Sequence, residues 1–297
     1  MTIKEYTEQI AKEFSKRIDK PVVAMEKEKN NGILFNGLEI TETNTINSIF
    51  YVNNLYKDNV CVADAVDKLC MWFEELKEER LRSYQWLCDF SLVKDKLCYK
   101  LVNKEENEFM IKDYVCEEFL DLLKIYTINI NDLSGNIQLG SIMIEKRLLE
   151  LWNVTEQEIK ELAEENIELI LPCIIAKMSD VMKRIIESKG GMLSEELKNR
   201  VDDSKLWVMT NEYRYDGAAT ICYKNDLKQF ACAMGCDIYI LPSSVHEIFL
   251  LPAGETTTEY LKQLVAETND IYVADEEFLS DNVYIYKRES EQIEILE

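Results

Sequence analysis

The chain contains 297 residues, of which 47% are hydrophobic and 30% are charged, and its formal net charge is −22. Nucleic acids and anionic membrane surfaces attract basic proteins, so this acidic balance argues against direct binding to either. We therefore expect a globular protein whose partner, if it is charged, is basic.

Nine cysteines are spread through the sequence, at positions 61, 70, 88, 98, 116, 173, 222, 232 and 236. Their number is odd and most lie in apolar periodic segments, which is typical of reduced thiols rather than of a disulfide framework. The first residues lack the pattern of a signal peptide, and no apolar run reaches the roughly 18–20 residues that span a bilayer. These features predict a soluble, cytoplasmic protein.

The first half of the chain mixes helical and strand patterns. Apolar residues at helical spacing predict helices over residues 3–17 and 61–80. Short apolar and β-branched runs predict strands over residues 22–26, 33–40, 46–52 and 97–102. Two longer runs, residues 119–130 and 137–144, flank the turn-forming segment Asn131–Gly135 and predict a β-hairpin.

The second half opens with helical patterns. Thr155 and Glu158 match a capping box, in which the two side chains satisfy free backbone N–H groups at a helix start. Pro172 limits this helix, a further helix is predicted over residues 174–188, and residues 189–204 have a loop-like composition.

From residue 206 onward the predicted order is β-β-α-β-β-α-β. The strands are expected at residues 206–210, 218–223, 238–241, 248–251 and 283–286, with helices near residues 227–234 and after a second capping box at Thr256–Glu259. Hairpins mixed with helices predict an α+β protein with mainly antiparallel sheets flanked by helices. We expect two lobes, residues 1–147 and residues 148–297, the second made of a helical linker and an α+β lobe.

Several segments resemble a known family. They are LWNVTEQEIKELAEENIELILP, DGAATICY, DIYILPSSVHEIFLLPA and FLSDNVYIYKRE, together with NGILFNGLEI and SIFYVNNLY near the start. They are similar, along nearly the whole chain, to an uncharacterised domain-of-unknown-function family of low-GC Gram-positive (Firmicute) bacteria. A weaker similarity links residues 148–297 to another uncharacterised bacillar family and implies a shared fold there. Neither resemblance implies an activity or site residues.

The only histidine, His246, is the natural centre of a hydrolytic site. As a general base it would activate Ser243, Ser244 or a more distant serine, and Asp216 or Asp281 would orient it. No G-x-S-x-G motif accompanies these residues. The alternative is a polar turn whose side chains bond to the local backbone, and we favour it.

Three cysteines offer a weak metal-site candidate. Cys232 and Cys236 have the spacing of one helix face, and Cys222 with His246 would complete a Cys3His zinc site. The spacing differs from that of short zinc knuckles, so buried structural thiols are the favoured interpretation. We expect no metal and no cofactor.

The leading functional hypothesis is a non-catalytic, acidic, cytoplasmic protein-binding or regulatory module with a protein partner that is possibly basic. It depends on the acidic surface and on the sheet edges that an α+β fold leaves available. The alternatives are an unrecognised hydrolase organised around His246 and, less favoured, an acidic mimic of nucleic acid. Carboxylates aligned along one surface at near-phosphate spacing would indicate the mimic.

Overall fold

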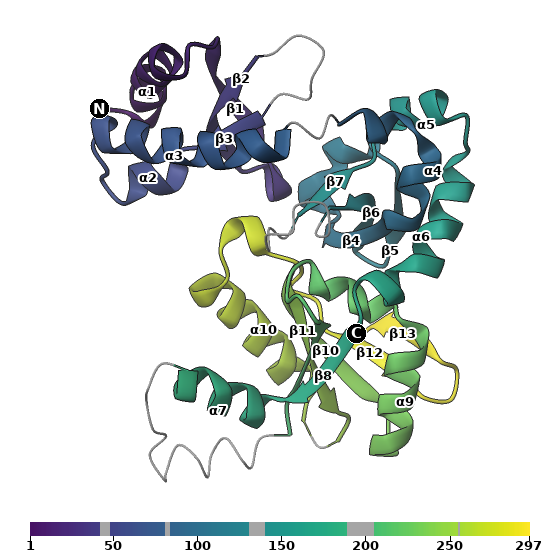
Figure 1. The fold of residues 1–297 in the computed structure, drawn as a ribbon. Coiled ribbons are helices and arrows are strands. Elements are labelled where there is room, and N and C mark those ends of the chain that lie inside the picture. The colour runs from purple at the N-terminus through teal and green to yellow at the C-terminus, as the bar shows by residue number, and fades with distance from the viewer. Residues whose placement is uncertain (42–47, 81–83, 131–139, 189–204, 255) are drawn as a thin grey trace. The chain divides into compact units, whose positions relative to one another are not determined.

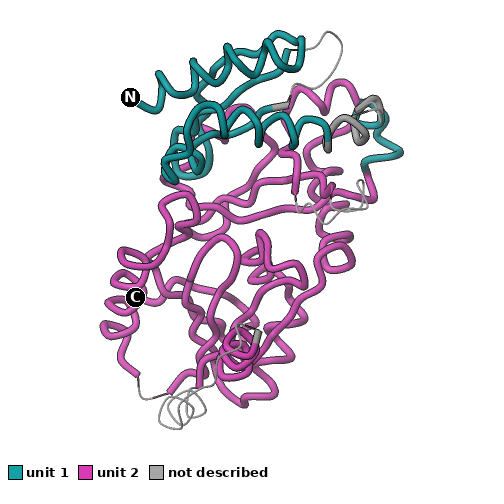
Figure 2. Tube along the Cα trace, turned by 60° about the vertical axis from the view of Figure 1, so that its left-hand side comes forward, with its two compact units in different colours: residues 1–93 teal, residues 94–297 magenta. Residues whose placement is uncertain are grey.

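The computed structural model describes residues 1–41, 48–80, 84–130, 140–188, 205–254 and 256–297. The chain forms two compact units, Met1–Val93 and Lys94–Glu297 (Figure 2). The lobe boundary expected at residue 148 lies inside the second unit and stays a prediction. The turn segment Asn131–Gly135 and the loop expected at residues 189–204 lie outside the described residues.

The predicted α+β class is confirmed: antiparallel sheets are flanked by helices (Figure 1). In the first unit, β1, β2 and β3 form one sheet in that order. The elements of this unit are α1 (Ile3–Ile18), β1 (Val22–Glu28), β2 (Leu34–Ile40), β3 (Ser48–Tyr51), α2 (Asn53–Lys57), α3 (Val62–Arg80) and α4 (Phe90–Val93).

The core of the first unit lies between α1, α3 and the sheet. Helix α1 begins at Thr2, whose hydroxyl accepts a hydrogen bond from the backbone N–H of Glu5 in a capping box. Its apolar face then buries Ile10 and Phe14 with Phe73 of α3. The Phe14 ring meets that of Phe73 edge-on at 6.1 Å. The helical spacing of apolar residues therefore determines which face of α1 is buried.

The second unit begins with a four-stranded sheet. Its elements are β4 (Leu97–Asn103), β5 (Cys116–Phe119), β6 (Leu122–Asn129) and β7 (Ser141–Met143), followed by α5 (Lys146–Trp152) and α6 (Glu156–Ile170). Strand β6 pairs with β4, β5 and β7. The predicted hairpin is confirmed, since Thr127 pairs with Met143. The run from residue 119 is split, because Leu120 adopts a left-handed conformation and turns the chain between β5 and β6.

A six-stranded antiparallel sheet follows in the order β13-β12-β10-β11-β9-β8. Its strands are β8 (Cys173–Lys177), β9 (Trp207–Asn211), β10 (Ile238–Ser244), β11 (Glu247–Pro252), β12 (Tyr284–Lys287) and β13 (Gln292–Ile295). The helices are α7 (Met178–Ser188), α9 (Lys224–Met234) and α10 (Thr258–Tyr272). Leu261 and Val265 of α10 are buried in a core with Leu241 and Val283.

Three local predictions are wrong. Residues 174–188 are not one helix: strand β8 comes first and α7 begins only at Met178. The strand expected at residues 218–223 is a 3-10 helix, Gly217–Cys222, whose small residues are buried. Short apolar runs do not distinguish strand from buried helix, which explains both errors. The N-cap of α10 is Thr257, one residue after the predicted capping box. Within the described residues, no helix is both long and apolar enough to cross a membrane.

Candidate functional site

His246 lies in the turn between β10 and β11, where three neighbours hold its ring. Its Nδ1 accepts a hydrogen bond of 3.1 Å from the backbone N–H of Asp216. Its Nε2 lies 3.5 Å from Oε1 of Glu277. The ring of Tyr215 stacks on the imidazole, with centroids 5.4 Å apart. Because Nδ1 is an acceptor, the neutral ring carries its proton on Nε2, facing the carboxylate.

The other residues of the hydrolase hypothesis are not arranged around this ring. The hydroxyl of Ser244 accepts a 3.1 Å hydrogen bond from the backbone N–H of His246. Ser243 lies in β10, at a shift of the strand register. The carboxylate of Asp281 accepts a 2.8 Å hydrogen bond from Asn269. Ser244 thus bonds to local backbone, the imidazole bonds to the more distant backbone of Asp216, and no serine hydroxyl hydrogen bonds to the imidazole among the described residues.

Asp216 is the most unusual residue near this turn. It is buried and adopts a left-handed conformation, with φ at 52°. Burial raises the pKa of its carboxyl group, against the opposing effects of Lys100 and His246. The next residue is Gly217, where an added Cβ would lie 2.4 Å from the carbonyl oxygen of His246. This close approach requires glycine and fixes the two turns against each other.

A pocket with a cavity volume of about 10 Å³, room for about one water molecule, lies beside Asp216 and is partly open to solvent. It is lined by Cys98, Tyr99, Thr127, Asn129, Gly140, Ser141, Leu171, Tyr215 and Asp216. His246 does not line it. Small-molecule sites usually occupy roughly 300–1,000 Å³. The pocket is therefore small for a substrate, and it does not join the imidazole to a nucleophile.

The cysteines of the metal-site candidate stay separate from His246. Cys222 ends the 3-10 helix, Cys232 lies exposed on α9, and Cys236 precedes β10. Burial raises the pKa of the Cys222 thiol to about 12, so this group is neutral at pH 7. In the parts of the chain that the structure describes, no three His, Cys, Asp or Glu side chains are placed to hold a metal ion.

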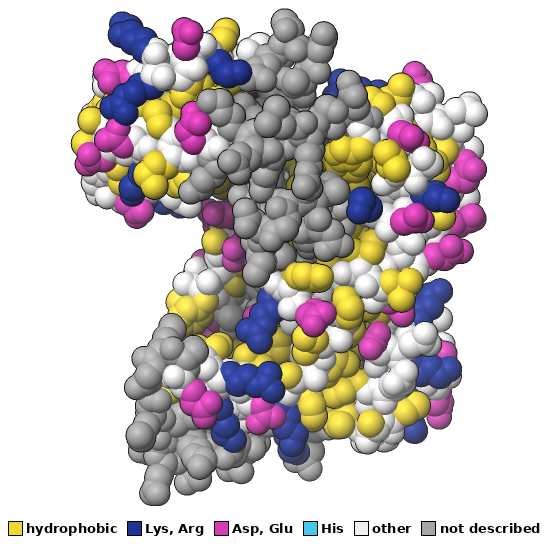
Figure 3. Space-filling view, viewed as in Figure 1, with side chains coloured by type: hydrophobic (Ala, Val, Ile, Leu, Met, Phe, Trp, Pro, Cys, Tyr) yellow, Lys and Arg dark blue, Asp and Glu magenta, His cyan; other side chains and the backbone are white. Residues whose placement is uncertain are grey.

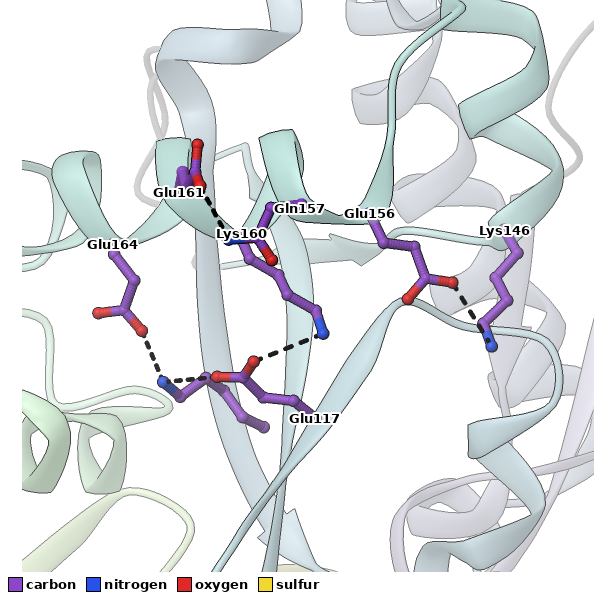
Figure 4. Close-up of polar contacts among 8 residues, drawn as sticks. Glu117, Lys146, Glu156, Gln157, Lys160, Glu161 and Glu164 are labelled. Atoms are coloured by element: carbon purple, nitrogen blue, oxygen red, sulfur yellow. Dashed lines mark hydrogen bonds and ion pairs between the residues drawn. The ribbon is translucent and has the colours of Figure 1, made fainter.

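A cluster of charges between β6 and α6 was not predicted from the sequence. Its centre is the ammonium group of Lys124, which lies 2.6 Å from Glu164 Oε1 and 3.2 Å from Glu117 Oε1. The Lys124 side chain is 8% exposed, whereas those carboxylates are 44% and 37% exposed. Lys160 reaches Glu117 from α6 at 3.5 Å (Figure 4). We call these four residues the Lys124 cluster.

Two tyrosines line the same side of the sheet. The Lys124 ammonium lies 4.4 Å from the centre of the Tyr99 ring, a favourable cation–π position. The hydroxyl of Tyr126 is buried and has no hydrogen-bond partner among the described residues. Burial raises the pKa of this hydroxyl most, and the nearby Glu117 adds to the increase. Burial is the largest single effect on Glu117 and opposes its charge, but Lys124, Tyr126 and Lys160 together outweigh burial and lower the pKa of that carboxyl group.

A second unpredicted set of contacts surrounds Asp121, in the turn between β5 and β6. Its carboxylate accepts hydrogen bonds from the Ser280 hydroxyl at 2.6 Å, the Asn282 amide at 2.9 Å and the Tyr284 hydroxyl at 2.8 Å. The three donors are neutral and lie just before or in β12. They satisfy the carboxylate and join the two sheets of the second unit.

Strand β8 forms one edge of the six-stranded sheet. Backbone hydrogen bonds from Met178 N–H to Leu206 and from Glu212 N–H to Pro172 bracket its ladder with β9. Because antiparallel pairs alternate, Ile174 and Ala176 point their backbone groups toward β9. The backbone N–H and C=O groups of Cys173, Ile175 and Lys177 therefore point away from the sheet. We call this row the β8 edge.

Strand β8 carries little of the protection that is usual on edge strands, as far as the described residues show. Cys173–Ala176 are uncharged and include no proline, and Lys177 is the one charged residue of the strand. By contrast, the edge strand β1 contains Glu26, Lys27 and Glu28. Charges and proline on an edge strand discourage pairing with another chain. Ile174, 40% exposed, adds an apolar side chain beside the β8 edge. Sequence analysis missed this site because it assigned residues 174–188 to a helix.

Comparison with known proteins identifies the chain by family only. The family model described as "Family of unknown function (DUF5688)" matches residues 3–288, so the chain belongs to that family. This confirms the expected membership in an uncharacterised family. No curated protein and no solved structure matches the chain.

Proposed function

We propose that this member of the DUF5688 family is a non-catalytic protein-binding module that receives an extended segment of its partner at the β8 edge. The observation that supports the proposal is the outward row of backbone groups on Cys173, Ile175 and Lys177. An extended peptide that pairs with such a row continues the sheet, and main-chain hydrogen bonds provide much of the affinity.

The surroundings of the strand favour an apolar contact in addition to pairing. Hydrophobic side chains gather on the visible face of the second unit, around the strands that Figure 1 labels β8, β10 and β12 (Figure 3). Exposed Ile174 would contact alternate side chains of the added strand. The net charge of −22 favours a basic partner and predicts weaker binding at high salt.

We also propose a reducing, cytoplasmic location. All nine cysteines are free thiols, which supports a compartment where disulfides do not form.

Substitution of Ile175 by proline tests whether the outward backbone N–H of this residue takes part in binding. The Ile175 N–H points away from β9, so Ile175→Pro removes an outward donor while the inward hydrogen bonds of its neighbours remain. Immobilised wild-type protein and the variant would each select binders from a phage-displayed random peptide library. We expect peptides to be enriched by the wild-type protein and at least tenfold fewer by Ile175→Pro.

Ile175→Ala is the matched control, because it loses the same side-chain packing and keeps the N–H group. We expect it to enrich the same peptides as the wild-type protein. Equal enrichment by the proline variant would place binding elsewhere on the molecule. If neither the peptides nor proteins from a native host lysate are retained at any salt concentration, the protein-binding function itself is wrong.

A further inference from the structure

The outer face of α10 carries an apolar stripe that the β8 edge does not use. Tyr260, Leu264 and Ile271 are exposed by 59%, 40% and 65%. With 3.6 residues per turn, these three positions fall within about 40° of one another around the helix axis. Leu261 and Val265 are buried on the side that faces the sheet. The stripe is therefore additional to the face that holds the helix on the fold.

Acidic side chains flank the stripe on one side and interrupt it at one position. Glu259 and Asp270 lie about 80–100° from Tyr260 around the helix, and Glu267 lies within the stripe itself. All three are exposed. The basic residue of α10 is Lys262. It lies about 160° from Tyr260, on the opposite side of the helix from the stripe. The exposed apolar surface is thus bordered by negative charge and not by positive charge.

We infer that the outer face of α10 binds an amphipathic helix with a basic polar face, supplied by a partner protein. An apolar row at positions i, i+4, i+7 and i+11 of that helix would lie on Tyr260, Leu264 and Ile271. Lysines or arginines beside the row would meet Glu259, Glu267 and Asp270. The stripe extends about 16 Å, or three helical turns, which sets the minimum length of the bound helix.

Charge argues for this occupant over a second copy of the chain. Two copies would each bring the same acidic border and a net charge of −22 to the interface. Like charges placed together at an interface oppose association. A basic helix removes this repulsion and pairs its cations with the carboxylates. The inference is independent of the β8 edge, which takes an extended segment along a strand and not on the face of α10.

The test uses a designed 14-residue helical peptide with leucine at the four apolar positions and lysine at most others. Its binding is measured by fluorescence anisotropy against the full chain. A peptide with glutamate in place of lysine is the charge control. We expect the basic peptide to bind, the acidic peptide not to bind, and the double variant Tyr260→Ala/Ile271→Ala to bind the basic peptide at least tenfold more weakly.

A matched variant separates the stripe from general attraction to an acidic protein. Leu169 on α6 is 82% exposed, and Leu169→Ala removes a similar apolar side chain elsewhere in the same unit. We expect Leu169→Ala to bind the basic peptide like the wild-type protein. Equal loss in both variants, no loss in either, or no binding at all would overturn the inference. So would sedimentation that shows a dimer of this chain lost only in the double variant, since a second copy would then occupy the stripe.

Discussion

The Lys124 cluster holds partly exposed carboxyl groups and the turn at Asp216 holds a buried one, and the pKa values of Glu117 and Asp216 shift in opposite directions. The pKa of Glu117 is lowered: burial is the largest single effect and raises it, but Lys124, Tyr126 and Lys160 together outweigh burial. The pKa of Asp216 is raised, because burial outweighs the attraction of Lys100 and His246. A cation in direct contact makes the difference: Glu117 lies 3.2 Å from an ammonium group, and no ion pair joins Asp216 within the described residues.

The two shifts have opposite consequences for stability. A lowered pKa means that Glu117 contributes stability above its unfolded pKa, near 4.3, and loses it as the pH falls through the folded value. A raised pKa means that Asp216 favours folding most below its unfolded pKa, near 3.9, and loses that contribution as the pH rises through the folded value.

The largest effect is expected when Lys124 loses both of its partners. The double variant Glu117→Gln/Glu164→Gln leaves a buried ammonium group without a counter-charge, and we expect it to lower the free energy of unfolding by about 3–5 kcal/mol. Urea denaturation at pH 7 measures this. Adding Lys124→Met to the double variant removes the buried charge, and we expect it to recover most of the lost free energy of unfolding. A triple variant no more stable than the double would show that packing, not charge, is lost.

Asp121 extends the comparison to a carboxylate that is held by neutral donors. Asp121→Ala would leave the donors of Ser280, Asn282 and Tyr284 without their acceptor. We expect a loss of at least about 3 kcal/mol in the free energy of unfolding, since hydrogen bonds to charged groups contribute about 1.5–3 kcal/mol each and the Ser280 and Tyr284 donors are buried. The control is Asp113→Ala, at an exposed aspartate. A loss equal to that of the control would contradict the role of Asp121.

The variant Asp216→Asn tests how burial of a carboxyl group without an ion pair affects the free energy of unfolding. Asparagine also tolerates a left-handed conformation, so the backbone at this position is retained. At pH 4 and below we expect the variant and the wild-type protein to have similar stability. Above that, the variant should gain about 1.4 kcal/mol for each pH unit until the carboxyl group of the folded wild-type protein ionises. Urea midpoints from pH 4 to 8 that run parallel for the two proteins would refute the raised pKa.

The smallest effect is expected at Tyr126. Its hydroxyl has no hydrogen-bond partner among the described residues, so Tyr126→Phe should change the free energy of unfolding by less than about 0.5 kcal/mol. Tyr284→Phe, which removes a donor from Asp121, is the comparison and should cost about 1–2 kcal/mol. Thermal unfolding of both variants distinguishes them, and equal losses would mean that Tyr126 has an unrecognised partner.

Periodic patterns in the sequence predicted most of the fold. Amphipathic spacing identified α1 and the capping box at Thr155 identified the start of α6, because both signals are local. Residues 173–177 were misassigned because a short apolar run after Pro172 fits strand and helix alike. Only the partner strand β9 decides between them, and that contact is not visible in local sequence.

The candidate sites were harder to predict. Sequence analysis singled out His246 because of its chemistry, but the carboxylate that faces it belongs to Glu277, thirty-one positions later. Lys124 is the one charged residue in a strand segment of buried residues, Leu122–Ile128. A lysine within a mainly apolar run was therefore the one signal in the sequence that a charge is buried here. No local signal marked Asp121, since its partners follow about 160 positions later.

That separation has a consequence for synthesis on the ribosome. The ribosome adds 163 further residues after Asp121 before Tyr284, whose hydroxyl donates to the Asp121 carboxylate, has been synthesised. At translation rates of roughly 5–20 residues per second, the delay is on the order of ten seconds. During that interval the nascent four-stranded sheet must leave the Asp121 carboxylate in water. The junction of the two sheets is therefore completed only after Tyr284 has been synthesised.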